Sequence, residues 1–559
     1  MRDTRAIYNE WLKNVKDEEL RKELLSMNEE AINDSFYSDL AFGTGGLRGV
    51  MAAGTGRMNI YTVAKATAGL GDYILAEHPD NKSVAIGYDT RNNSENFARL
   101  AATILAAKGI KVYLWAEALP TPMLSYAVRT LGCFAGIMLT ASHNPSKYNG
   151  YKVYREDGCQ ITEEAAAKIS ECIGKKSDFG NIPSATFEEL CESKIIDIIS
   201  DDVYEAFIKE VMANSMLKSD TGADRSVKIV YTALNGTGRR PVLDVLSRSG
   251  FSAISTVAEQ MAPDGNFPTC PYPNPEIPEA MSLGLKYAEG CGAEILLATD
   301  PDCDRVGVGV RKPDGSYTLL TGNEIGLLLL EFICKRRTEA GTMPKSAVMV
   351  KTIVTTDLAE RIATSYGVKT ANVLTGFKYI GDYIGELEAA GRTEDYILGF
   401  EESCGYLTAG YVRDKDGVLA AMLISELAAY YSAKGRCLFD VLSDVYKTYG
   451  FCKNSLRSYT FEGNLGFSKM QSIMAKIREG VASFGGLKVE GVSDYKSGLD
   501  GLPPSDVLKF KLEGGSTVVI RPSGTEPKLK AYFSASADSE SAANELTARM
   551  VDDVNALMK

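Results

Sequence analysis

A serine and a histidine follow directly on an apolar segment in the first third of the chain. Residues 135–139 are predicted to form a buried strand, and the hexapeptide Thr140-Ala141-Ser142-His143-Asn144-Pro145 comes next. Open α/β sheets bind ligands beyond the carboxyl ends of their strands. Because the residue before proline avoids helical geometry, the chain is expected to turn there. We expect this turn to hold the Ser142 hydroxyl in a ligand site; the alternative is an ordinary strand-to-loop turn with solvated polar side chains.

Three aspartates alternate along a second loop, which also follows a predicted strand. They are Asp300, Asp302 and Asp304. Three carboxylates this close repel one another unless a cation lies among them, and oxygen ligands suit Mg²⁺. An EF-hand loop is the competing metal motif, but Arg305 and Arg311 stand where that motif needs glycine and glutamate. The remaining alternative is a solvated acidic turn.

Two further loops carry polar side chains, one suited to hydroxyl groups and the other to a phosphate. Glu401 and Ser403, after the apolar residues 396–398, offer partners for sugar hydroxyl groups, although an exposed acidic turn has the same pattern. The stretch 521–528, Arg-Pro-Ser-Gly-Thr-Glu-Pro-Lys, offers an arginine fork, two hydroxyls and flexible backbone N–H groups. Such groups can converge on one phosphate; the alternative is a surface turn.

A glycine-rich loop, residues 42–49, precedes all of these motifs. Its sequence is Phe-Gly-Thr-Gly-Gly-Leu-Arg-Gly. The glycines predict unusual backbone angles or a close approach to a ligand. The loop is not a Walker A motif, because no Gly-Lys-Ser/Thr sequence follows it.

Length and composition predict a large soluble protein. The chain has 559 residues, a net charge of −12 and eleven cysteines without a CxxC pair. The length predicts three or four domains. The charge argues against nucleic acid or an anionic membrane as partner. The cysteines are typical of reduced thiols in the cytoplasm, the charged N-terminus does not resemble a signal peptide, and the longest apolar segment, residues 325–333, is too short to span a bilayer.

A strand–helix–strand pattern occurs three times. It begins at Val84, Val227 and Ala347, and a glycine stands at each predicted helix end: Gly109, Gly250 and Gly367. Glycine is the usual left-handed C-cap of a helix. Three such strand–helix–strand patterns predict three related α/β domains. Separate Rossmann-like units are the alternative.

The remaining segments suggest the boundaries. Residues 5–35 are predicted to be helical, and Thr321 to Glu324 resemble a capping box that opens a long helix. Residues 507–512 and 517–520 flank Gly514-Gly515, a hairpin signal, and a helix is predicted over 541–558. We expect domains at 1–200, 201–320, 321–440 and 441–559, the last being a smaller α+β domain.

Taken together and in this order, the four motifs resemble those of the α-D-phosphohexomutase family of phosphoglucomutases and phosphomannomutases. The resemblance implies three related α/β domains with mixed sheets and a C-terminal α+β domain around a central cleft. The loop at residues 42–49 is similar to that of the longer branch of the family. That branch contains α-phosphoglucomutases, phosphopentomutases and sugar-bisphosphate synthases.

The resemblance implies roles for individual residues. Ser142 would carry the phosphate, faced by Arg48, while Lys152 or His143 would exchange the hydroxyl proton. Asp300, Asp302 and Asp304, with an oxygen of the phosphorylated Ser142, would bind Mg²⁺. The implied substrate-binding residues are Arg305, Lys351, Thr375, Gly376, Lys378, Glu401, Ser403 and Lys415, and the implied phosphate-binding residues are Arg521, Ser523, Gly524 and Thr525.

The implied activity is the interconversion of glucose 1-phosphate and glucose 6-phosphate through a phosphoserine enzyme and a sugar 1,6-bisphosphate. We expect a cytoplasmic monomer or weak homodimer whose last domain closes over the substrate to exclude water. Phosphopentomutase and phosphomannomutase are the alternatives within the family. A phosphatase and a non-catalytic phosphosugar-binding protein are the alternatives outside it.

Overall fold

The structure is a computed structural model that describes residues 2–77, 80, 82–218, 222–461, 466–522 and 528–558. The chain forms two compact units. The first consists of Met1–Leu319, Gly381–Thr393 and Gly405–Gly435, and the second of Leu320–Ile380, Glu394–Cys404 and Arg436–Lys559.

The first sheet of the first unit has the strand order β1-β5-β4-β2-β3-β6. Its strands are β1 (Leu47–Val50), β2 (Ser83–Tyr88), β3 (Lys111–Leu114), β4 (Ala135–Leu139), β5 (Tyr148–Arg155) and β6 (Ile196–Ile198). The strands β4, β2, β3 and β6 are parallel, while β5 is antiparallel to both β4 and β1. The carboxyl ends of β2 and β4 therefore lie at one edge of the sheet, and Ser142 follows β4 there.

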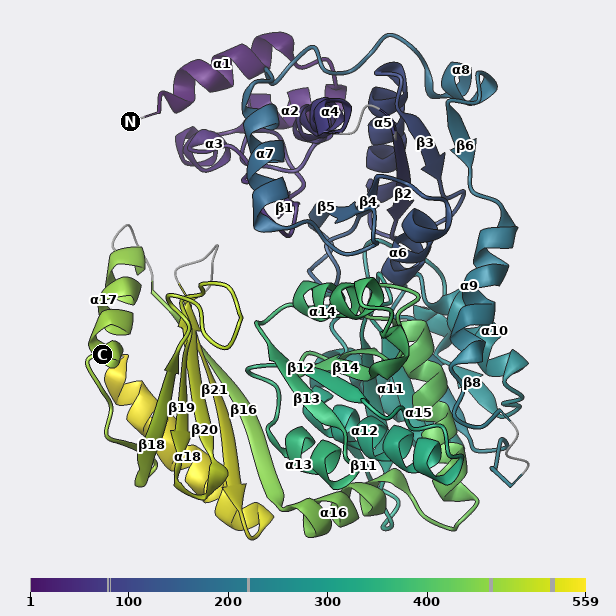
Figure 1. The fold of residues 1–559 in the computed structure, drawn as a ribbon. Helices are drawn as coiled ribbons and strands as arrows, with labels where there is room; N and C mark the ends of the chain where they lie inside the picture. Colours follow the sequence, from purple (N-terminus) through teal and green to yellow (C-terminus); the bar gives the residue numbers. More distant parts are fainter. Residues whose placement is uncertain are drawn as a thin grey trace. The chain divides into compact units, whose positions relative to one another are not determined.

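Helices bury the apolar faces of this sheet (Figure 1). They are α4 (Ile60–Glu77), α5 (Ser94–Ala107), α6 (Thr121–Thr130), α7 (Glu163–Gly174) and α8 (Phe187–Glu192). The predicted N-terminal helical segment forms α1 (Thr4–Asn14), α2 (Glu18–Ser26) and α3 (Glu29–Phe36). Trp11 is fully buried there, against the rings of Phe36, Tyr61 and Phe179. This aromatic cluster attaches the N-terminal helices to the first α/β domain.

The second sheet of the first unit has the order β11-β10-β9-β7-β8. Its strands are β7 (Ile229–Thr232), β8 (Ile254–Thr256), β9 (Ile295–Thr299), β10 (Val306–Arg311) and β11 (Tyr317–Leu320). The helical segments of this region are α9 (Asp201–Ala213), α10 (Arg239–Arg248), η1 (Ala258–Gln260) and α11 (Pro278–Cys291). The strands β9 and β10 are antiparallel neighbours, so the three aspartates occupy the connection between them.

The second unit contains a parallel arrangement in which β12 lies between β13 and β14. Its elements are α12 (Gly322–Glu339), β12 (Val348–Thr352), α13 (Leu358–Ser365), β13 (Lys369–Val373), η2 (Thr393–Asp395), β14 (Tyr396–Glu401) and α16 (Leu438–Tyr449). The helix α14 (Phe377–Ala389) runs from the second unit into the first. The strand β15 (Gly405–Leu407) and the helix α15 (Gly417–Ser432) belong to the first unit.

The last region of the second unit is an antiparallel sheet with the order β16-β21-β20-β19-β18-β17. Its strands are β16 (Phe451–Thr460), β17 (Ser483–Phe484), β18 (Leu487–Asp494), β19 (Leu508–Leu512), β20 (Thr517–Pro522) and β21 (Lys528–Ala537). The short helix η3 (Glu513–Gly515) joins β19 to β20. The helices α17 (Gly466–Arg478) and α18 (Glu540–Leu557) cover one face of the sheet (Figure 1).

The predicted fold class of three α/β domains with a C-terminal α+β domain is confirmed. The three predicted helix-ending glycines, Gly109, Gly250 and Gly367, have φ angles of 79°, 86° and 71°, as left-handed caps require. The capping box at Thr321 and Glu324 is present at the start of α12, and β19 and β20 form the predicted hairpin. The domain boundaries stay predictions.

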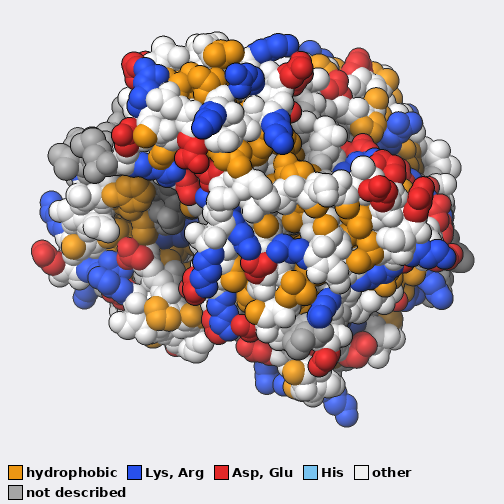
Figure 2. All heavy atoms as spheres, turned by 90° about the horizontal axis from the view of Figure 1, so that it is seen from above, with side chains coloured by type: hydrophobic (Ala, Val, Ile, Leu, Met, Phe, Trp, Pro, Cys, Tyr) orange, Lys and Arg blue, Asp and Glu red, His pale blue; other side chains and the backbone are white. Residues whose placement is uncertain are grey.

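The cysteines, the helices and the surface charge can be compared with what the composition predicts. All eleven cysteines are free. Among the described residues, no helix combines the length and the apolar character that crossing a membrane requires. On the face shown in Figure 2, basic and acidic side chains are intermixed rather than gathered by sign.

Candidate active site

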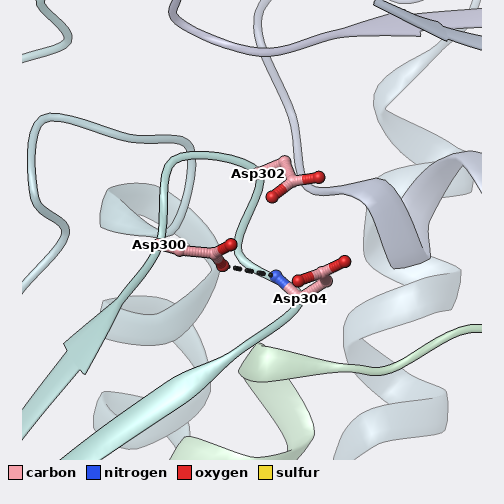
Figure 3. Close-up of side chains that lie close together, drawn as sticks. All are labelled: Asp300, Asp302 and Asp304. Atoms are coloured by element: carbon pink, nitrogen blue, oxygen red, sulfur yellow. Dashed lines mark hydrogen bonds between the residues drawn. The ribbon is translucent and has the colours of Figure 1, made fainter. Parts of the chain in front are cut away.

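The connection between β9 and β10 brings three buried carboxylates together. Asp300, Asp302 and Asp304 are each at most 2% exposed, and one oxygen from each lies within 4.8 Å of the others. Figure 3 shows the side chains and the hydrogen bond from the Asp304 backbone N–H to the Asp300 carboxylate. Cys303, between the last two aspartates, has a φ angle of 50°, a left-handed conformation that folds the connection back on itself.

Backbone N–H groups at the N-terminal ends of three helices hold this loop by its carbonyl groups. Just before α10, Thr237 N–H donates to the Pro301 carbonyl at 2.9 Å. At the start of α6, Thr121 N–H donates to the Asp302 carbonyl at 2.9 Å. At the start of α15, Gly417 N–H donates to the Cys303 carbonyl at 3.1 Å. Because helix N-termini carry partial positive charge, they offset part of the repulsion among the aspartates.

One oxygen of Asp300 and one of Asp302 are each saturated by two donors. The backbone N–H groups of Asp304 and Arg305 donate to Asp300 Oδ1 at 3.1 and 3.0 Å. Thr121 Oγ1 and Lys152 Nζ donate to Asp302 Oδ2 at 2.9 and 3.0 Å.

The third carboxylate, Asp304, is held by a lysine and leaves its other oxygen without a hydrogen bond. Lys415 Nζ lies 3.1 Å from Asp304 Oδ2. Among the described residues, none donates a hydrogen bond to Asp302 Oδ1 or to Asp304 Oδ1, although both atoms are buried. Burying such oxygens without a partner costs free energy. The three aspartates can therefore hold a metal ion that prefers oxygen ligands.

The three pKa values differ because the surroundings differ. Burial and the Asp304 and Asp302 carboxylates raise the pKa of Asp300 well above its ordinary value. Burial and Asp302 likewise raise the pKa of Asp304. Burial also opposes ionisation of Asp302, but the charge and hydrogen bond of Lys152 outweigh it and bring the pKa below the ordinary value. The lysine therefore keeps the middle carboxylate ionised.

The Ser142 hydroxyl lies beside this trio. Ser142 Oγ donates to Asp300 Oδ2 at 3.0 Å and lies 3.2 Å from His143 Nδ1. The φ angle of Ser142 is 51°, and its N–H donates to Thr140 Oγ1 at 2.8 Å. The predicted sharp turn after β4 is thus confirmed, and it brings the serine to the acidic loop.

A buried arginine keeps this turn in place. The Arg91 guanidinium, 3% exposed, donates to the carbonyls of Ser142 at 2.6 Å, Pro145 at 2.9 Å and Tyr148 at 3.2 Å. Asp89 lies 3.3 Å from it. Sequence reasoning missed Arg91, because no local signal distinguishes it from a solvated arginine in the loop after β2.

The neighbouring His143 is a weak base here. Burial, followed by the positive charges of Arg305 and Arg48, lowers the pKa of His143 well below its ordinary value. The imidazole is therefore neutral near pH 7, and a neutral ring nitrogen can accept a proton.

The glycine-rich loop packs against β5 and presents Arg48. In the antiparallel pairing of β1 with β5, Arg48 stands opposite Gly150, and Arg48 Nη1 donates to Asn144 Oδ1 at 3.2 Å. Gly46 has a φ angle of 74°, and a Cβ there would lie 1.8 Å from the Tyr151 carbonyl oxygen. The expectation of an unusual backbone angle is confirmed at Gly46, and the close approach there is to the backbone of β5.

In the second unit, two of the predicted sugar-binding loops meet. Glu401, at the end of β14, is 6% exposed, and its Oε1 accepts the Gly376 N–H at 3.0 Å. The adjacent Thr375 hydroxyl is buried and has no hydrogen-bond partner among the described residues. Lys378 Nζ lies 4.7 Å from the centre of the Tyr379 ring, and Ser403 is half-buried in the loop after β14.

Two other predicted site residues of the second unit have partners within the protein. Lys351 is fully buried, with its Nζ 2.7 Å from Asp357 Oδ1. Arg521, at the end of β20, donates to the Tyr532 hydroxyl at 3.4 Å. The predicted phosphate-binding residues Ser523, Gly524 and Thr525 lie outside the described residues.

Comparison with known proteins gives four matches along the chain, in the order of the motifs. They are the phosphoglucomutase/phosphomannomutase α/β/α domains I, II and III, at residues 39–179, 205–315 and 321–449, and the C-terminal domain of the same family at 470–553. A phosphoglucomutase of Staphylococcus saprophyticus is 38% identical over 536 residues, which cover 94% of this chain and 95% of the relative. This chain belongs to the phosphoglucomutase/phosphomannomutase family. It is a phosphosugar mutase, an isomerase.

Solved structures of the family share the fold. A protein of Thermus thermophilus, named as a candidate phosphomannomutase, is 24% identical with a TM-score of 0.70, covering 93% of this chain and 99% of its own. Parafusin, a phosphoglucomutase from Paramecium solved in its open form, is 17% identical with a TM-score of 0.67. That match covers 93% of this chain and 94% of parafusin.

The resemblance implied that Lys415 contacts the substrate, and in the structure its Nζ lies against the loop of the three aspartates. Lys415 Nζ also lies 2.8 Å from Asp414 Oδ1, and Asp414 Oδ2 accepts the Tyr154 hydroxyl at 2.9 Å. Asp414, Tyr154 and Thr121 were missed. The one available signal was the pair of prolines that flank Thr121.

Proposed function

We propose that this mutase interconverts glucose 1-phosphate and glucose 6-phosphate, with Ser142 as the covalent phosphate carrier. The observation that carries the proposal is the position of Ser142 Oγ, 3.0 Å from a carboxylate oxygen of the buried aspartate trio. A phosphoryl group on Ser142 would lie beside the place where a cation can neutralise its charge. Phosphoryl transfer depends mainly on such positioning and neutralisation.

The transfer begins with phosphorylated Ser142 and a sugar monophosphate. The bond between phosphorus and Ser142 Oγ breaks, and a sugar hydroxyl oxygen forms the new bond to phosphorus. The proton can be exchanged in two ways. His143, whose neutral ring nitrogen lies 3.2 Å from Ser142 Oγ, can accept the sugar hydroxyl proton and pass it to the departing Oγ. Alternatively the charged Lys152, which lies beside Asp302, gives a proton to Ser142 Oγ and then takes up the sugar hydroxyl proton. The resulting sugar 1,6-bisphosphate turns over, and its other phosphoryl group returns to Ser142 Oγ.

Asp300, Asp302 and Asp304 would hold Mg²⁺. When bound, Mg²⁺ supplies charge neutralisation to the phosphoryl group during transfer. The donor set fits this ion, because all three ligands are carboxylates and two of their buried oxygens lack a hydrogen-bond donor among the described residues. We propose that Arg48 and Arg305 neutralise the remaining negative charge of the phosphate.

In the second unit, Glu401 and Ser403 would bind sugar hydroxyl groups, and Arg521 would bind the phosphate that is not being transferred. The Gly376–Glu401 hydrogen bond supports the first assignment, because it holds the carboxylate in one orientation. The remaining substrate contacts that we propose are Lys351, Thr375, Gly376, Lys378 and Lys415, with Ser523, Gly524 and Thr525 for the phosphate.

Two arguments support glucose as the substrate. The sugar bisphosphate must reorient between the two transfer steps, and relatives of this chain are named phosphoglucomutase. One ring must bind in two orientations related by a half-turn, so hydroxyls that keep their places are the best contacts. In glucose these are the equatorial 3- and 4-hydroxyls. Mannose shares both and differs at C2, so one lost contact discriminates by only about 1–3 kcal/mol. A pentose phosphate has fewer hydroxyls and a shorter span between its phosphates.

A substrate panel tests this choice. We expect kcat/KM for glucose 1-phosphate to exceed that for mannose 1-phosphate, and ribose 1-phosphate and deoxyribose 1-phosphate to follow. A pentose phosphate that leads by tenfold would move the assignment to phosphopentomutase and leave the Ser142 mechanism in place.

The role of Ser142 is tested on the protein as purified. Peptide mass spectrometry should find one phosphate on Ser142, and Ser142→Ala should lower turnover by several orders of magnitude, as removal of a nucleophile does. Ser146→Ala is the matched control, because Ser146 lies in the same loop. Near-normal turnover of Ser142→Ala would refute the mechanism. A phosphosugar-binding protein without catalysis would bind glucose 1-phosphate but show no mutase activity with a trace of glucose 1,6-bisphosphate.

A further inference from the structure

Thr121 stands between two prolines at the start of α6. The sequence Pro120-Thr121-Pro122 has φ restrained on both sides of the threonine. Pro122 has no backbone N–H, and Thr121 is the first helical residue, so its N–H is one of the helix-end donors that need a partner outside the helix. The local sequence therefore restrains the backbone that carries the Thr121 N–H and hydroxyl.

Both groups of Thr121 bind the same residue. Its N–H donates to the Asp302 carbonyl at 2.9 Å, and its Oγ1 donates to Asp302 Oδ2 at 2.9 Å. Thr121 and Asp302 are each 0% exposed. The two bonds restrain the backbone and the carboxylate of Asp302 together, which limits rotation of that side chain.

The restraint decides which oxygen of Asp302 remains for a ligand. With Oδ2 occupied by Thr121, the Asp302 oxygen to which no described residue donates is Oδ1. One oxygen of Asp302 lies within 4.8 Å of an oxygen of Asp300 and of Asp304. Lys152 also donates to Oδ2 at 3.0 Å. A lysine has a long, flexible stem and can change partner. Thr121 has a short side chain and also binds the Asp302 carbonyl through its backbone N–H, so it is the more firmly held of the two donors.

We propose that Thr121 is a positioning residue for the metal ion, acting through Asp302. The inference rests on the proposed metal site and extends it to a residue of another α/β domain, since α6 belongs to the first sheet region and Asp302 to the second. Groups that orient a metal ligand in this way typically contribute 10- to 100-fold to metal affinity.

The test measures the dissociation constant of Mg²⁺ by titration calorimetry on purified full-length protein. Thr121→Val keeps the shape and loses the hydroxyl, and we expect it to weaken Mg²⁺ binding by about 10- to 100-fold. Thr121→Ser keeps the hydroxyl and should bind Mg²⁺ within about threefold of the natural protein. Thr103→Val is the matched control, because the Thr103 hydroxyl donates to the Arg99 carbonyl within α5 and should not affect the metal.

A second measurement separates positioning from general damage. Mutase activity is measured against Mg²⁺ concentration, and we expect Thr121→Val to recover most of its activity when Mg²⁺ is raised in proportion to the weaker affinity. A residue that only supported folding would leave the half-saturating Mg²⁺ concentration unchanged. If Thr121→Val does not fold, Thr121→Ala, which removes the hydroxyl without placing a methyl against the carboxylate, takes its place.

The outcomes distinguish this inference from the proposed function. If the natural protein binds no Mg²⁺, the proposed metal site is wrong. If it binds Mg²⁺ and a folded Thr121→Val or Thr121→Ala binds equally well, the metal site stands and the role of Thr121 is wrong. Weaker binding by the variant without the hydroxyl, together with rescue by serine, supports the proposal.

Discussion

Two groups of charged side chains in this protein, one buried and one partly buried, differ in how their carboxylates are paired. In the first unit, the loop of Asp300, Asp302 and Asp304 leaves two buried carboxylate oxygens without a hydrogen bond from the described residues. In the second unit, the Asp357 cluster (Lys351, Asp357, Glu360 and Lys509) has two lysines and two carboxylates. Asp357 Oδ1 lies 2.7 Å from Lys351 Nζ and 3.0 Å from Lys509 Nζ.

The pKa values follow the same contrast. Burial raises the pKa of Asp300 well above its ordinary value, and its acidic neighbours raise it further. Burial also raises the pKa of Asp357, but Lys351 and Lys509 outweigh it and lower the pKa to about 2. In the Asp357 cluster, two lysines face two carboxylates, which supports the fold. The aspartate loop also contacts two lysines, Lys152 and Lys415, but it keeps two buried oxygens to which no described residue donates and which a cation can bind. Four changes test this difference.

Removing the metal should have the largest effect on activity and a small effect on stability. Exhaustive treatment with a chelator should abolish turnover, because the charge of the transferred phosphoryl group is then not neutralised. Added Mg²⁺ should restore turnover. The melting temperature should change little, because backbone N–H groups and lysines hold the loop without the ion. Full activity after chelation would contradict the assignment of the three aspartates.

Asp357→Asn should have the reverse effect. Among the described residues it leaves Glu360 as the one carboxylate paired with the buried Lys351, beside the Thr355 carbonyl. Breaking a buried ion pair typically costs about 3–5 kcal/mol. Denaturant unfolding should show this loss at pH 7, while Mg²⁺ affinity stays unchanged. Because the folded pKa of Asp357 lies below its ordinary value, its contribution is present above about pH 4 and is lost as the pH falls through about 2. A loss below about 1 kcal/mol at pH 7 would contradict the structural role of the cluster.

Arg521→Ala tests a charge that pairs with no carboxylate among the described residues. The guanidinium donates to the Tyr532 hydroxyl, so it remains able to bind a phosphate. Losing a charge-assisted contact of about 1.5–3 kcal/mol should raise KM about 10- to 100-fold, while Ser142 still becomes phosphorylated. Arg457→Ala, on the exposed strand β16, is the control. An unchanged KM would remove Arg521 from the phosphate site.

Glu360→Gln should have the smallest effect. Glu360 Oε1 lies 3.2 Å from Lys351 Nζ, but its side chain is 40% exposed. Exposed pairs contribute about 0–1 kcal/mol, so the free energy of unfolding should fall by no more than that. A loss as large as that of Asp357→Asn would show that both carboxylates are needed to balance the two lysines.

Much of the site could be predicted because its chemistry is local in the sequence. Ser142 and the aspartates stand directly after apolar strands, and the prediction that these loops carry the site followed from that placement. The ion-pair partner of each lysine could not be predicted in this way. Lys351 and Lys415 both match family positions, yet Lys351 pairs with Asp357 and Lys415 with Asp304. A lysine's partner depends on which segments pack together, and residue type does not encode it.

The sequence by itself determined the strands, the capped helices and the loops with reactive side chains, because hydrophobic period, glycine caps and turn chemistry act over a few residues. Only the tertiary structure decided which oxygen of each aspartate is occupied and which is left for a ligand. Thr121 lies 181 residues before Asp302, and Lys152 lies 150 residues before it. Hydrogen bonds across such separations form only after the α/β domains have packed, so they leave no pattern along the chain.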